Sequence, residues 1–386
     1  MIAGHVAAGF EPVRDAFAAN FERPKAYREL GAALAVYRHG DCVVDLWGGH
    51  ADRALARPWT RDTLVNLWST TKGIAALCVA RLVDRGALSY EDRVAAHWPG
   101  FAAAGKAEVT VAQLLSHQAG LPGFAEPISV EDLFDQPAAA ARLAAQAPLW
   151  PPGTANGYHA VTWGVLAAEL VRRVDGRTIG RFLAEELAGP AGADVHIGLP
   201  PALGDRVAEL VPPDQPVDLG ALELNPAMVM ALASPRLDPC QANETGWRTA
   251  ELPALNGHGS AQGVARLYAA ALSGALFSAD TLAQMTGVAA DRVDLVLGFN
   301  PQWGMGVASN ATGMFGPLPD VFGHSGWGGS FGCAHRESGL AIGYALNHMG
   351  PELVGDPRAT ALCAAVFACV DGEKGAFPEA QMPSEG

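Results

Sequence analysis

Cysteine is scarce in this sequence, and acidic residues outnumber basic ones. Six cysteines occur among 386 residues, and no two of them form a C-x-x-C pair. A disulfide framework is therefore not expected. The 26 basic residues stand against 40 acidic ones, which gives a net charge of −14. An acidic surface repels phosphate backbones and anionic lipids, so we expect neither nucleic acid nor a membrane as a partner.

Long apolar runs, export signals and cofactor motifs are also missing. No run of about 18 apolar residues occurs, and Met1 to His5 are not a basic stretch followed by an apolar one. We therefore expect a soluble protein that stays in the cytoplasm. Neither H-E-x-x-H nor G-x-x-x-x-G-K-[ST] is present, and no Cys/His pairs stand at zinc spacing. No metal or cofactor is expected, and the oligomeric state is left open.

Strand patterns lie near both ends of the chain. Residues 33–37 and 42–47 are β-prone and flank a turn at 39–41, and residues 332–347 form two strand patterns that turn at 338–339. The composition, 49% hydrophobic and 17% charged, is that of a packed globular protein, and the length fits two domains.

Helical patterns fill the middle of the chain and also accompany the strands. A helix that begins at Ser69 is expected to end at Gly86, and a helix over 161–174 is expected to end at Asp175-Gly176. Thr110 and Gln113 fit a capping box, in which each side chain binds the backbone of the other residue. Further helices are expected over 10–21, 264–272 and 358–370.

These patterns predict an α+β fold. An antiparallel sheet flanked by helices would be built from residues 1–88 and 250–386, and an all-helical domain over residues 89–249 would be inserted between these two segments. Substrate sites are common between two such units, so we expect the active-site cleft there.

A serine followed by a lysine one helical turn later is the most informative feature. Ser69 and Lys72 open the expected helix, and a spacing of three places both side chains on one face. A serine hydroxyl needs a base to act as a nucleophile, and a lysine that loses its charge through burial can be that base. An N-capping serine beside an exposed lysine is the alternative reading. The apolar sequence on both sides of the pair favours burial.

Three further segments accompany this S-x-T-K pattern. They are Leu114 to Pro122, Trp150 to Gly153 followed by Tyr158, and Phe322 to Gly326. In this order they resemble the L-L-x-H-x-S-G-L-P block, the P-G-x-x-x-x-Y-S-N region and the H-T-G or K-T-G motif of the serine β-lactamase and penicillin-binding-protein superfamily. The resemblance covers most of the chain and is closest to family VIII carboxylesterases of the class C-like branch. It implies the β-lactamase/DD-peptidase-like fold.

The resemblance also implies a role for each matched residue. Ser69 would be the acylated nucleophile and Lys72 its proton partner, and the Tyr158 phenol would pass a proton to the leaving group. Whether Lys72 or Tyr158 is the general base is left open by the sequence. The backbone N–H groups of Ser69 and Trp327 would form the oxyanion hole. The substrate cleft opposite the nucleophile would be lined by His324, Ser325 and Gly326.

Two positions depart from the lactamase pattern. Ala160 stands where Y-x-N would carry an asparagine, and His324 stands where many members carry a lysine. Neither residue can hold a β-lactam amide or carboxylate as its counterpart would. Together with the indole of Trp327, these departures favour neutral acyl substrates such as short-chain esters.

A second serine fits another hydrolase pattern. Residues 328–332 read G-x-S-x-G around Ser330, as in the nucleophile elbow of α/β-hydrolases, but strand patterns and not a helix follow Gly332. We therefore reject Ser330 as the nucleophile. His117 is expected to hold a loop through hydrogen bonds and to take no part in chemistry.

The sequence thus predicts a serine hydrolase that cleaves short-chain carboxylic esters through an acyl-enzyme on Ser69. An amidase, D-peptidase or weak β-lactamase of the same fold stays open as an alternative, as does an acyltransferase. A catalytically dead binding protein is disfavoured because Ser69, Lys72 and Tyr158 are all present.

Overall fold

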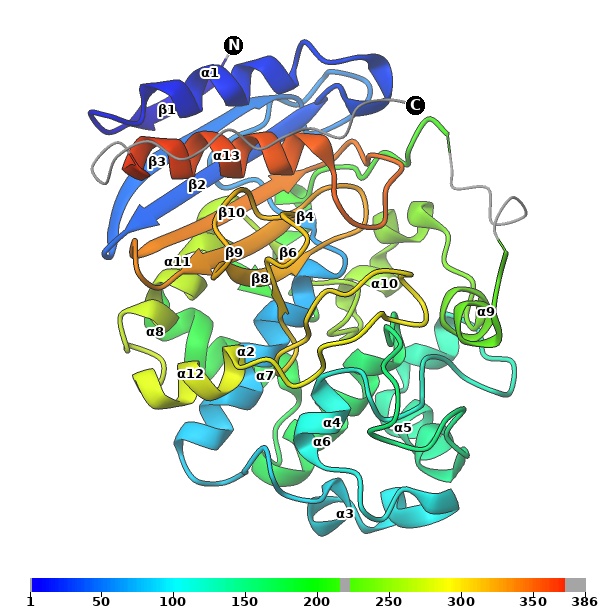
Figure 1. Cartoon of the computed structure of the whole chain (residues 1–386). Coiled ribbons are helices and arrows are strands. Elements are labelled where there is room, and N and C mark those ends of the chain that lie inside the picture. Colours follow the sequence, from blue (N-terminus) through cyan, green and yellow to red (C-terminus); the bar gives the residue numbers. More distant parts are fainter. Residues whose placement is uncertain (1, 216–222, 372–386) are drawn as a thin grey trace, which may run out of the picture.

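The computed structural model of the chain describes residues 2–215 and 223–371. A strand-rich part lies at the top of Figure 1, and a helical part lies below it. Among the described residues, no helix combines the length and the apolar character needed to cross a membrane.

Seven antiparallel strands form the main sheet, in the order β1-β3-β2-β10-β9-β8-β7. They come from two separate stretches of the chain: β1 (Ile2–Val6), β2 (Gly31–Arg38), β3 (Asp41–Gly49), β7 (Ala308–Ser309), β8 (Phe322–Ser325), β9 (Phe331–His335) and β10 (Leu340–Leu346). Strands β2 and β10 join the two stretches, with Leu34 paired opposite Tyr344.

The helices cover this sheet and build the lower part of the molecule. Their bounds are α1 (Glu11–Asn20), α2 (Thr70–Asp84), α3 (Val94–His97), α4 (Val111–Leu115), α5 (Gln136–Ala145), α6 (Thr162–Asp175), α7 (Ile179–Leu183), α8 (Gly189–Ala191), α9 (Pro226–Ala233), α10 (Thr245–Thr249), α11 (Ala261–Leu272), α12 (Ala279–Thr286) and α13 (Pro357–Asp371).

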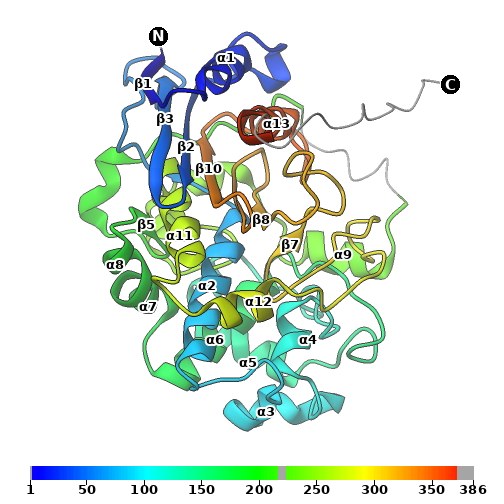
Figure 2. The ribbon, with the colours of Figure 1, turned by 60° about the vertical axis from the view of Figure 1, so that its left-hand side comes forward.

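Helices α1 and α13 lie side by side on one face of the sheet, and α11 packs on the other (Figures 1 and 2). Alternate residues of a strand point to opposite faces, and both faces of β2 are buried. Leu34 packs in one core with Phe17 of α1 and Phe367 of α13, while Ala33 and Ala35 belong to the core on the α11 side. A central strand buried on both faces reads as a nearly continuous apolar run.

Small residues on the α11 side let this helix approach the sheet closely. A Cβ added at Gly343 of β10 would lie 2.3 Å from the Ala261 carbonyl oxygen, and one at Gly332 of β9 would lie 2.6 Å from the Tyr268 ring. Ala341 and Ala345 point into the same core as α11. The alternation of large and small side chains along β10 therefore sets how near α11 lies.

A second, three-stranded sheet fixes the chain just before α2. It has the order β4-β6-β5, formed by β4 (Val65–Asn66), β5 (Val195–His196) and β6 (His258–Gly259). Next to it, the Leu67 N–H donates to the Gly257 carbonyl at 2.7 Å. This sheet connects the helical middle of the chain to the start of α2.

Most of the predicted elements are confirmed. The hairpin β2–β3 and the pair β9–β10 lie where expected, α6 ends at Gly176 with φ +90°, and the capping box at Thr110 and Gln113 forms both of its hydrogen bonds. The α+β architecture with an antiparallel sheet is also confirmed. The edge strand β1 was not predicted. Within residues 89–249, where only helices were expected, β5 adds a short strand.

We predict that Gly343→Ala destabilises the fold, because its Cβ would meet α11 backbone at 2.3 Å. Overpacking of this kind costs about 1–3 kcal/mol. The free energy of unfolding in urea measures the effect. Gly204→Ala is the control, since a Cβ there has no neighbour within 4 Å. Equal stabilities of the two variants would contradict the close packing of α11.

Candidate active site

Ser69 lies at the N-terminus of α2, directly after a strained turn. Trp68, a bulky residue, has a left-handed backbone with φ +47°. Such a conformation costs about 1–3 kcal/mol unless the surroundings hold it. Here the Thr71 hydroxyl donates to the Trp68 carbonyl at 2.5 Å and accepts from the Gly257 N–H at 2.9 Å. The turn leaves Ser69 at the start of the helix with its side chain 8% exposed.

Lys72 lies one turn further along α2 and is fully buried. Its Nζ is 3.0 Å from Ser69 Oγ and donates to the carbonyls of Ala160 at 2.7 Å and Ala254 at 3.2 Å. Among the described residues, no carboxylate forms an ion pair with it, and burial holds the pKa of this amine well below its usual range. The geometry therefore places beside the hydroxyl an amine that loses its proton more readily than an exposed lysine does.

Tyr158 approaches Ser69 from the segment before α6. Its hydroxyl donates to Ser69 Oγ at 2.7 Å, and its ring stacks on Trp303 with centroids 5.7 Å apart and planes 7° apart. Lys72 Nζ lies 4.7 Å from the centre of the Tyr158 ring. Burial raises the pKa of the phenol, so it keeps its proton at neutral pH. The structure thus brings Ser69, Lys72 and Tyr158 together at one oxygen.

Asp294 was missed in the sequence, although it fixes the Tyr158 backbone. Its fully buried carboxylate accepts from the Tyr158 N–H at 2.9 Å and from Trp303 Nε1 at 3.0 Å. It also accepts from the Asn156 amide and from the N–H groups of Val296 and Leu297. Five donors to one carboxylate replace the water lost on burial. A single acidic residue in an irregular loop gave no sequence signal.

Strand β8 places His324, Ser325 and Gly326 beside α2. A Cβ at Gly73 would lie 3.2 Å from His324 Cβ, and one at Gly326 would lie 2.2 Å from the Leu67 carbonyl, so both glycines permit the close approach. His324 is 5% exposed and lies 6.2 Å from the Tyr158 ring, centroid to centroid. Burial, with the nearby Lys72, lowers the pKa of His324 to about 3. The imidazole is therefore neutral at pH 7.

Trp327 lies in a tight turn that follows β8. Gly326 N–H donates to the Ser330 carbonyl at 2.7 Å, and Gly329 N–H donates to the Gly326 carbonyl at 3.1 Å. The Trp327 ring packs against Trp68, with centroids 5.1 Å apart. Within the described part of the chain, the N–H groups of Ser69 and Trp327 donate to no other protein group. Both donors are therefore free for a ligand.

The two residues that we set aside have structural contacts. Ser330 Oγ donates to the Leu67 carbonyl at 2.8 Å and lies 2.9 Å from Thr70 Oγ1, and strand β9 follows it. His117 Nδ1 accepts from the His159 N–H at 3.0 Å, and its ring lies 4.4 Å from Trp303. Ser330 therefore ties the Trp327 turn to the start of α2, and His117 supports the segment that carries Tyr158.

An apolar hollow opens beside Tyr158 and His324. It encloses about 310 Å³, part of it open to solvent, and is lined by Tyr158, Leu297, Phe299, Pro301, Trp303, Ala308, Met314, His324, Ser325, Leu353 and Val354. None of these residues carries a formal charge.

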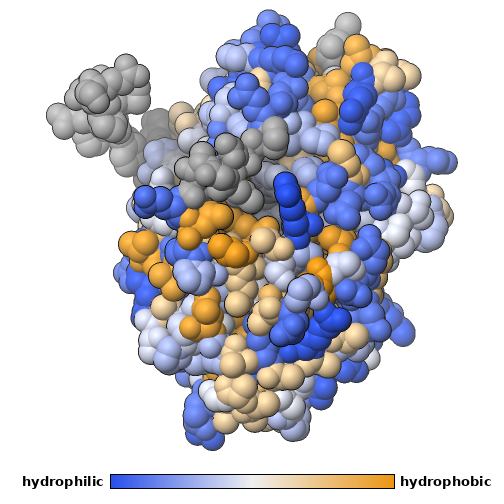
Figure 3. Space-filling model, turned by 90° about the vertical axis from the view of Figure 1, so that its right-hand side faces the viewer, coloured by the Kyte–Doolittle hydropathy of each residue, from blue (hydrophilic) through white to orange (hydrophobic). Residues whose placement is uncertain are grey.

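Apolar side chains also gather on the face that bears α9, shown in Figure 3. In the described ranges, 2–215 and 223–371, no group of three or more acidic, histidine or cysteine residues could hold a metal ion.

Comparisons with known proteins agree on one family. The family model described as Beta-lactamase matches residues 17–365. Esterase/beta-lactamase LipL of Mycobacterium tuberculosis is 36% identical over 341 residues, which cover 84% of this chain and 78% of LipL.

Two solved structures resemble the chain over nearly its whole length. One, described as a family VIII carboxylesterase, has a TM-score of 0.90 and 46% identity and covers 96% of this chain and 100% of its own. A penicillin-binding protein homologue from Caulobacter crescentus has a TM-score of 0.88 and 43% identity, with the same coverage of 96% and 100%.

We predict that the folded protein loses stability as the pH falls from 7 to 5, because four buried histidines stay neutral in the fold. Burial lowers the pKa of His159 to about 4 and those of His258 and His324 to about 3, and that of His117 well below its usual value. Unfolded histidines titrate near ~6.5, so the unfolded chain binds more protons below that pH.

Glu29 acts in the opposite sense. Burial raises its pKa from 4.5 to about 7, so its contribution to stability is present below pH 4.5 and is lost as the pH rises to about 7. Four histidines outweigh one carboxyl group. Urea unfolding followed at pH 7, 6 and 5 measures the slope, and a stability that stays level or rises toward pH 5 would show that these histidines are protonated in the fold.

Proposed function

Since the chain belongs to the β-lactamase family, we propose that it is a serine carboxylesterase that cleaves short-chain esters through an acyl-enzyme on Ser69. The main observation in support of this proposal is the position of the Ser69 hydroxyl oxygen. Ser69 Oγ lies 3.0 Å from Lys72 Nζ and 2.7 Å from the Tyr158 hydroxyl, inside a buried site. Relatives named esterase or carboxylesterase support the choice of substrate.

In the first step, Lys72 removes the proton of Ser69. A neutral amine has two N–H groups and one lone pair, and the carbonyls of Ala160 and Ala254 accept both N–H groups. The lone pair is left to face Ser69 Oγ. As this oxygen attacks the ester carbonyl, the N–H groups of Ser69 and Trp327 receive the negative oxygen of the tetrahedral intermediate. The N-terminus of α2 adds its positive dipole.

In the second step, Tyr158 protonates the departing alcohol. Its phenol keeps its proton because burial raises its pKa, and an alkoxide is basic enough to take it. The Lys72 ammonium then returns a proton to the tyrosine. Water attacks the acyl-enzyme with the same groups in reversed roles, which releases the acid and restores Ser69.

The neutral lining favours esters over substrates that carry a carboxylate. His324 is uncharged at pH 7, and no charged residue lines the hollow beside it. In this proposal His324, Ser325 and Gly326 form the substrate-cleft wall. Hydrolysis of amides or β-lactams is the second candidate, because the acylation groups would serve it and one relative is named Esterase/beta-lactamase.

Two sequence-based hypotheses accompany this proposal. The first divides the chain into a sheet domain of residues 1–88 and 250–386 and a helical domain of residues 89–249. All seven strands of the main sheet fall in the first of these units. The second is a location in the cytoplasm, with a small ester as the partner and no nucleic acid or membrane.

We predict that the wild-type chain hydrolyses p-nitrophenyl butyrate and that Ser69→Ala lowers kcat/KM by about 10⁴-fold or more, as removal of a nucleophile does. A chromogenic cephalosporin measured in parallel is expected to be a much poorer substrate. Ser330→Ala is the matched control: a fluorophosphonate should still label it but should not label Ser69→Ala. A cephalosporin cleaved faster than the ester would favour the second candidate, and labelling of Ser69→Ala would exclude Ser69 as the nucleophile.

We further predict that Asp294→Asn impairs Tyr158. The asparagine would turn an NH₂ group toward donors that now face a carboxylate oxygen, which shifts the Tyr158 backbone. Because Tyr158 protonates the leaving group, kcat should fall about 10-fold for ethyl butyrate and less for p-nitrophenyl butyrate, whose leaving group needs no proton.

Asp291→Asn is the control for this prediction. Asp291 belongs to the same loop but is exposed, and its carboxylate accepts hydrogen bonds from the Asn300 and Gln302 side chains. An equal loss of kcat for both esters would assign Asp294 a purely structural role.

A further inference from the structure

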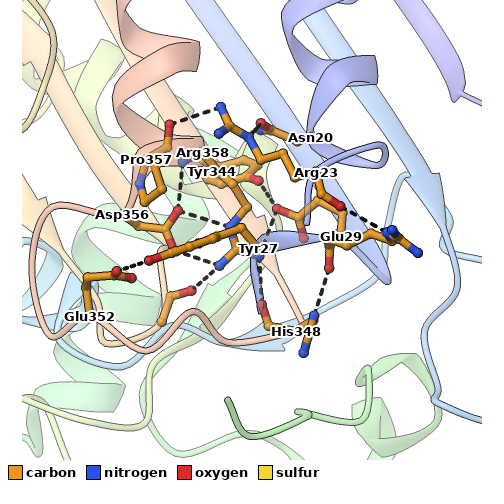
Figure 4. A network of polar contacts seen from close by, with 12 residues as sticks. Asn20, Arg23, Tyr27, Glu29, Tyr344, His348, Glu352, Asp356, Pro357 and Arg358 are labelled. Carbon is orange, nitrogen blue, oxygen red and sulfur yellow. Dashed lines mark hydrogen bonds and ion pairs between the residues drawn. The ribbon is translucent and has the colours of Figure 1, made fainter. Parts of the chain in front are cut away.

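A buried polar network, drawn in Figure 4, contacts the turn that carries Trp327 through the Gly328 carbonyl. Its centre is Arg358, which is 0% exposed although it lies at the start of α13. Two carboxyl groups face it: Asp356 Oδ2 lies 2.7 Å from Nη2, and Glu29 Oε1 lies 3.3 Å from Nη1. The Tyr344 hydroxyl donates to Glu29 from β10.

The guanidinium of Arg358 donates four hydrogen bonds and forms an ion pair with Glu29. Nε and Nη2 donate to Asp356 at 3.0 and 2.7 Å, and Nη1 faces Glu29 and donates to the His348 carbonyl at 2.9 Å. The remaining N–H of Nη2 donates to the Gly328 carbonyl at 2.8 Å. Gly328 directly follows Trp327. One arm of the network therefore ends on the turn that carries the second oxyanion donor.

The Trp327 turn packs tightly against this network and is also hydrogen-bonded to it. A Cβ at Gly329 would lie 2.7 Å from Asp356 Oδ2 and 3.1 Å from Arg358 Nη2. Gly350 N–H donates to the same Gly328 carbonyl at 3.0 Å, and Gly328 N–H donates to the Glu352 carbonyl at 3.3 Å. The Gly328 peptide is thus held on both its N–H and its C=O side. Its neighbour, the Trp327 N–H, donates to no protein group among the described residues.

We propose that Arg358 is a positioning residue for catalysis, which, together with Asp356 and Glu29, holds the Trp327 turn so that the Trp327 N–H points at the oxygen of the tetrahedral intermediate. This inference rests on the proposed esterase function. Preorganised donors stabilise developing charge only when their position is fixed before the reaction. A turn rich in glycine would not hold such a position unaided. The network supplies the missing rigidity from the far side of the sheet.

The test compares Arg358→Lys with Tyr344→Phe. Arg358→Lys keeps the charge but replaces the planar fork of five N–H groups by one nitrogen with three, so the four hydrogen bonds to Asp356, His348 and Gly328 cannot all be kept. Tyr344→Phe removes a hydrogen bond from the same network but leaves the Gly328 contact in place. Both variants are expected to be less stable in thermal unfolding. Only Arg358→Lys should lose oxyanion stabilisation.

Two readouts isolate the oxyanion donor. The first is the rate at which a fluorophosphonate labels Ser69, since its phosphoryl oxygen needs the same donors; we expect Arg358→Lys to react about 10-fold to 100-fold more slowly. The second is the ratio of kcat/KM for an oxo ester to that for its thiono analogue, because sulfur accepts these hydrogen bonds poorly. This ratio should fall in Arg358→Lys and stay at the wild-type value in Tyr344→Phe.

Each outcome of this experiment decides one question. If Arg358→Lys is labelled as fast as Tyr344→Phe and keeps the wild-type oxo/thiono ratio, the inference is wrong. If Arg358→Lys does not fold, Gly350→Ala replaces it: its Cβ would lie 2.4 Å from Asp356 Oδ2 and 3.0 Å from Arg358 Nη2, which displaces the pair without removing it. Fast wild-type labelling without ester cleavage would refute the esterase proposal alone, because the labelling rates of the variants still test Arg358.

Discussion

Burial of the Lys72 amine constrains everything around Ser69. An ammonium in this position would have no carboxylate beside it, and an unpaired charge in the interior is far more costly than a neutral amine. A buried neutral amine still needs acceptors for its two N–H groups, and the carbonyls of Ala160 and Ala254 are those acceptors. These two residues come from distant parts of the chain. The position of the proposed base is therefore fixed by backbone groups that only the folded chain brings together.

Other segments of the candidate site are likewise held in place by buried polar groups that lie outside it. Asp294 holds the backbone of Tyr158, the Thr71 hydroxyl holds the strained Trp68 turn, and the Ser330 hydroxyl ties the turn after β8 to Leu67. Buried polar groups of this kind are costly when unpaired and specific when fully paired. The reacting side chains are consequently held by contacts outside the site, and mutations at those contacts act on chemistry without touching substrate.

Much of the fold could be predicted from the sequence because local signals were strong. The β2–β3 hairpin, the capping box at Thr110 and the Gly176 stop each depend on neighbouring residues, and Ser69, Lys72 and Tyr158 belong to motifs with fixed spacing. Strand β1 gave no such signal, since it is an edge strand whose residues 3–5 are exposed. Asp294 and Arg358 were beyond prediction for another reason. Tyr158, whose backbone Asp294 holds, and Glu29, which faces Arg358, lie far away in the sequence, and only the folded chain shows that both side chains are buried.

The neutral charge of His324 affects the protonation of Lys72, the proposed base, as well as the choice of substrate. A permanent cation on β8 would oppose the protonation of Lys72, because like charges in a buried site repel strongly. Burial is the largest cause that keeps His324 uncharged. In the proposed mechanism, Lys72 takes the Ser69 proton and becomes a cation opposite the developing oxyanion. Replacing the lysine of the edge-strand motif by histidine thus removes an anchor for substrate carboxylates and also leaves the amine of Lys72 free to accept a proton.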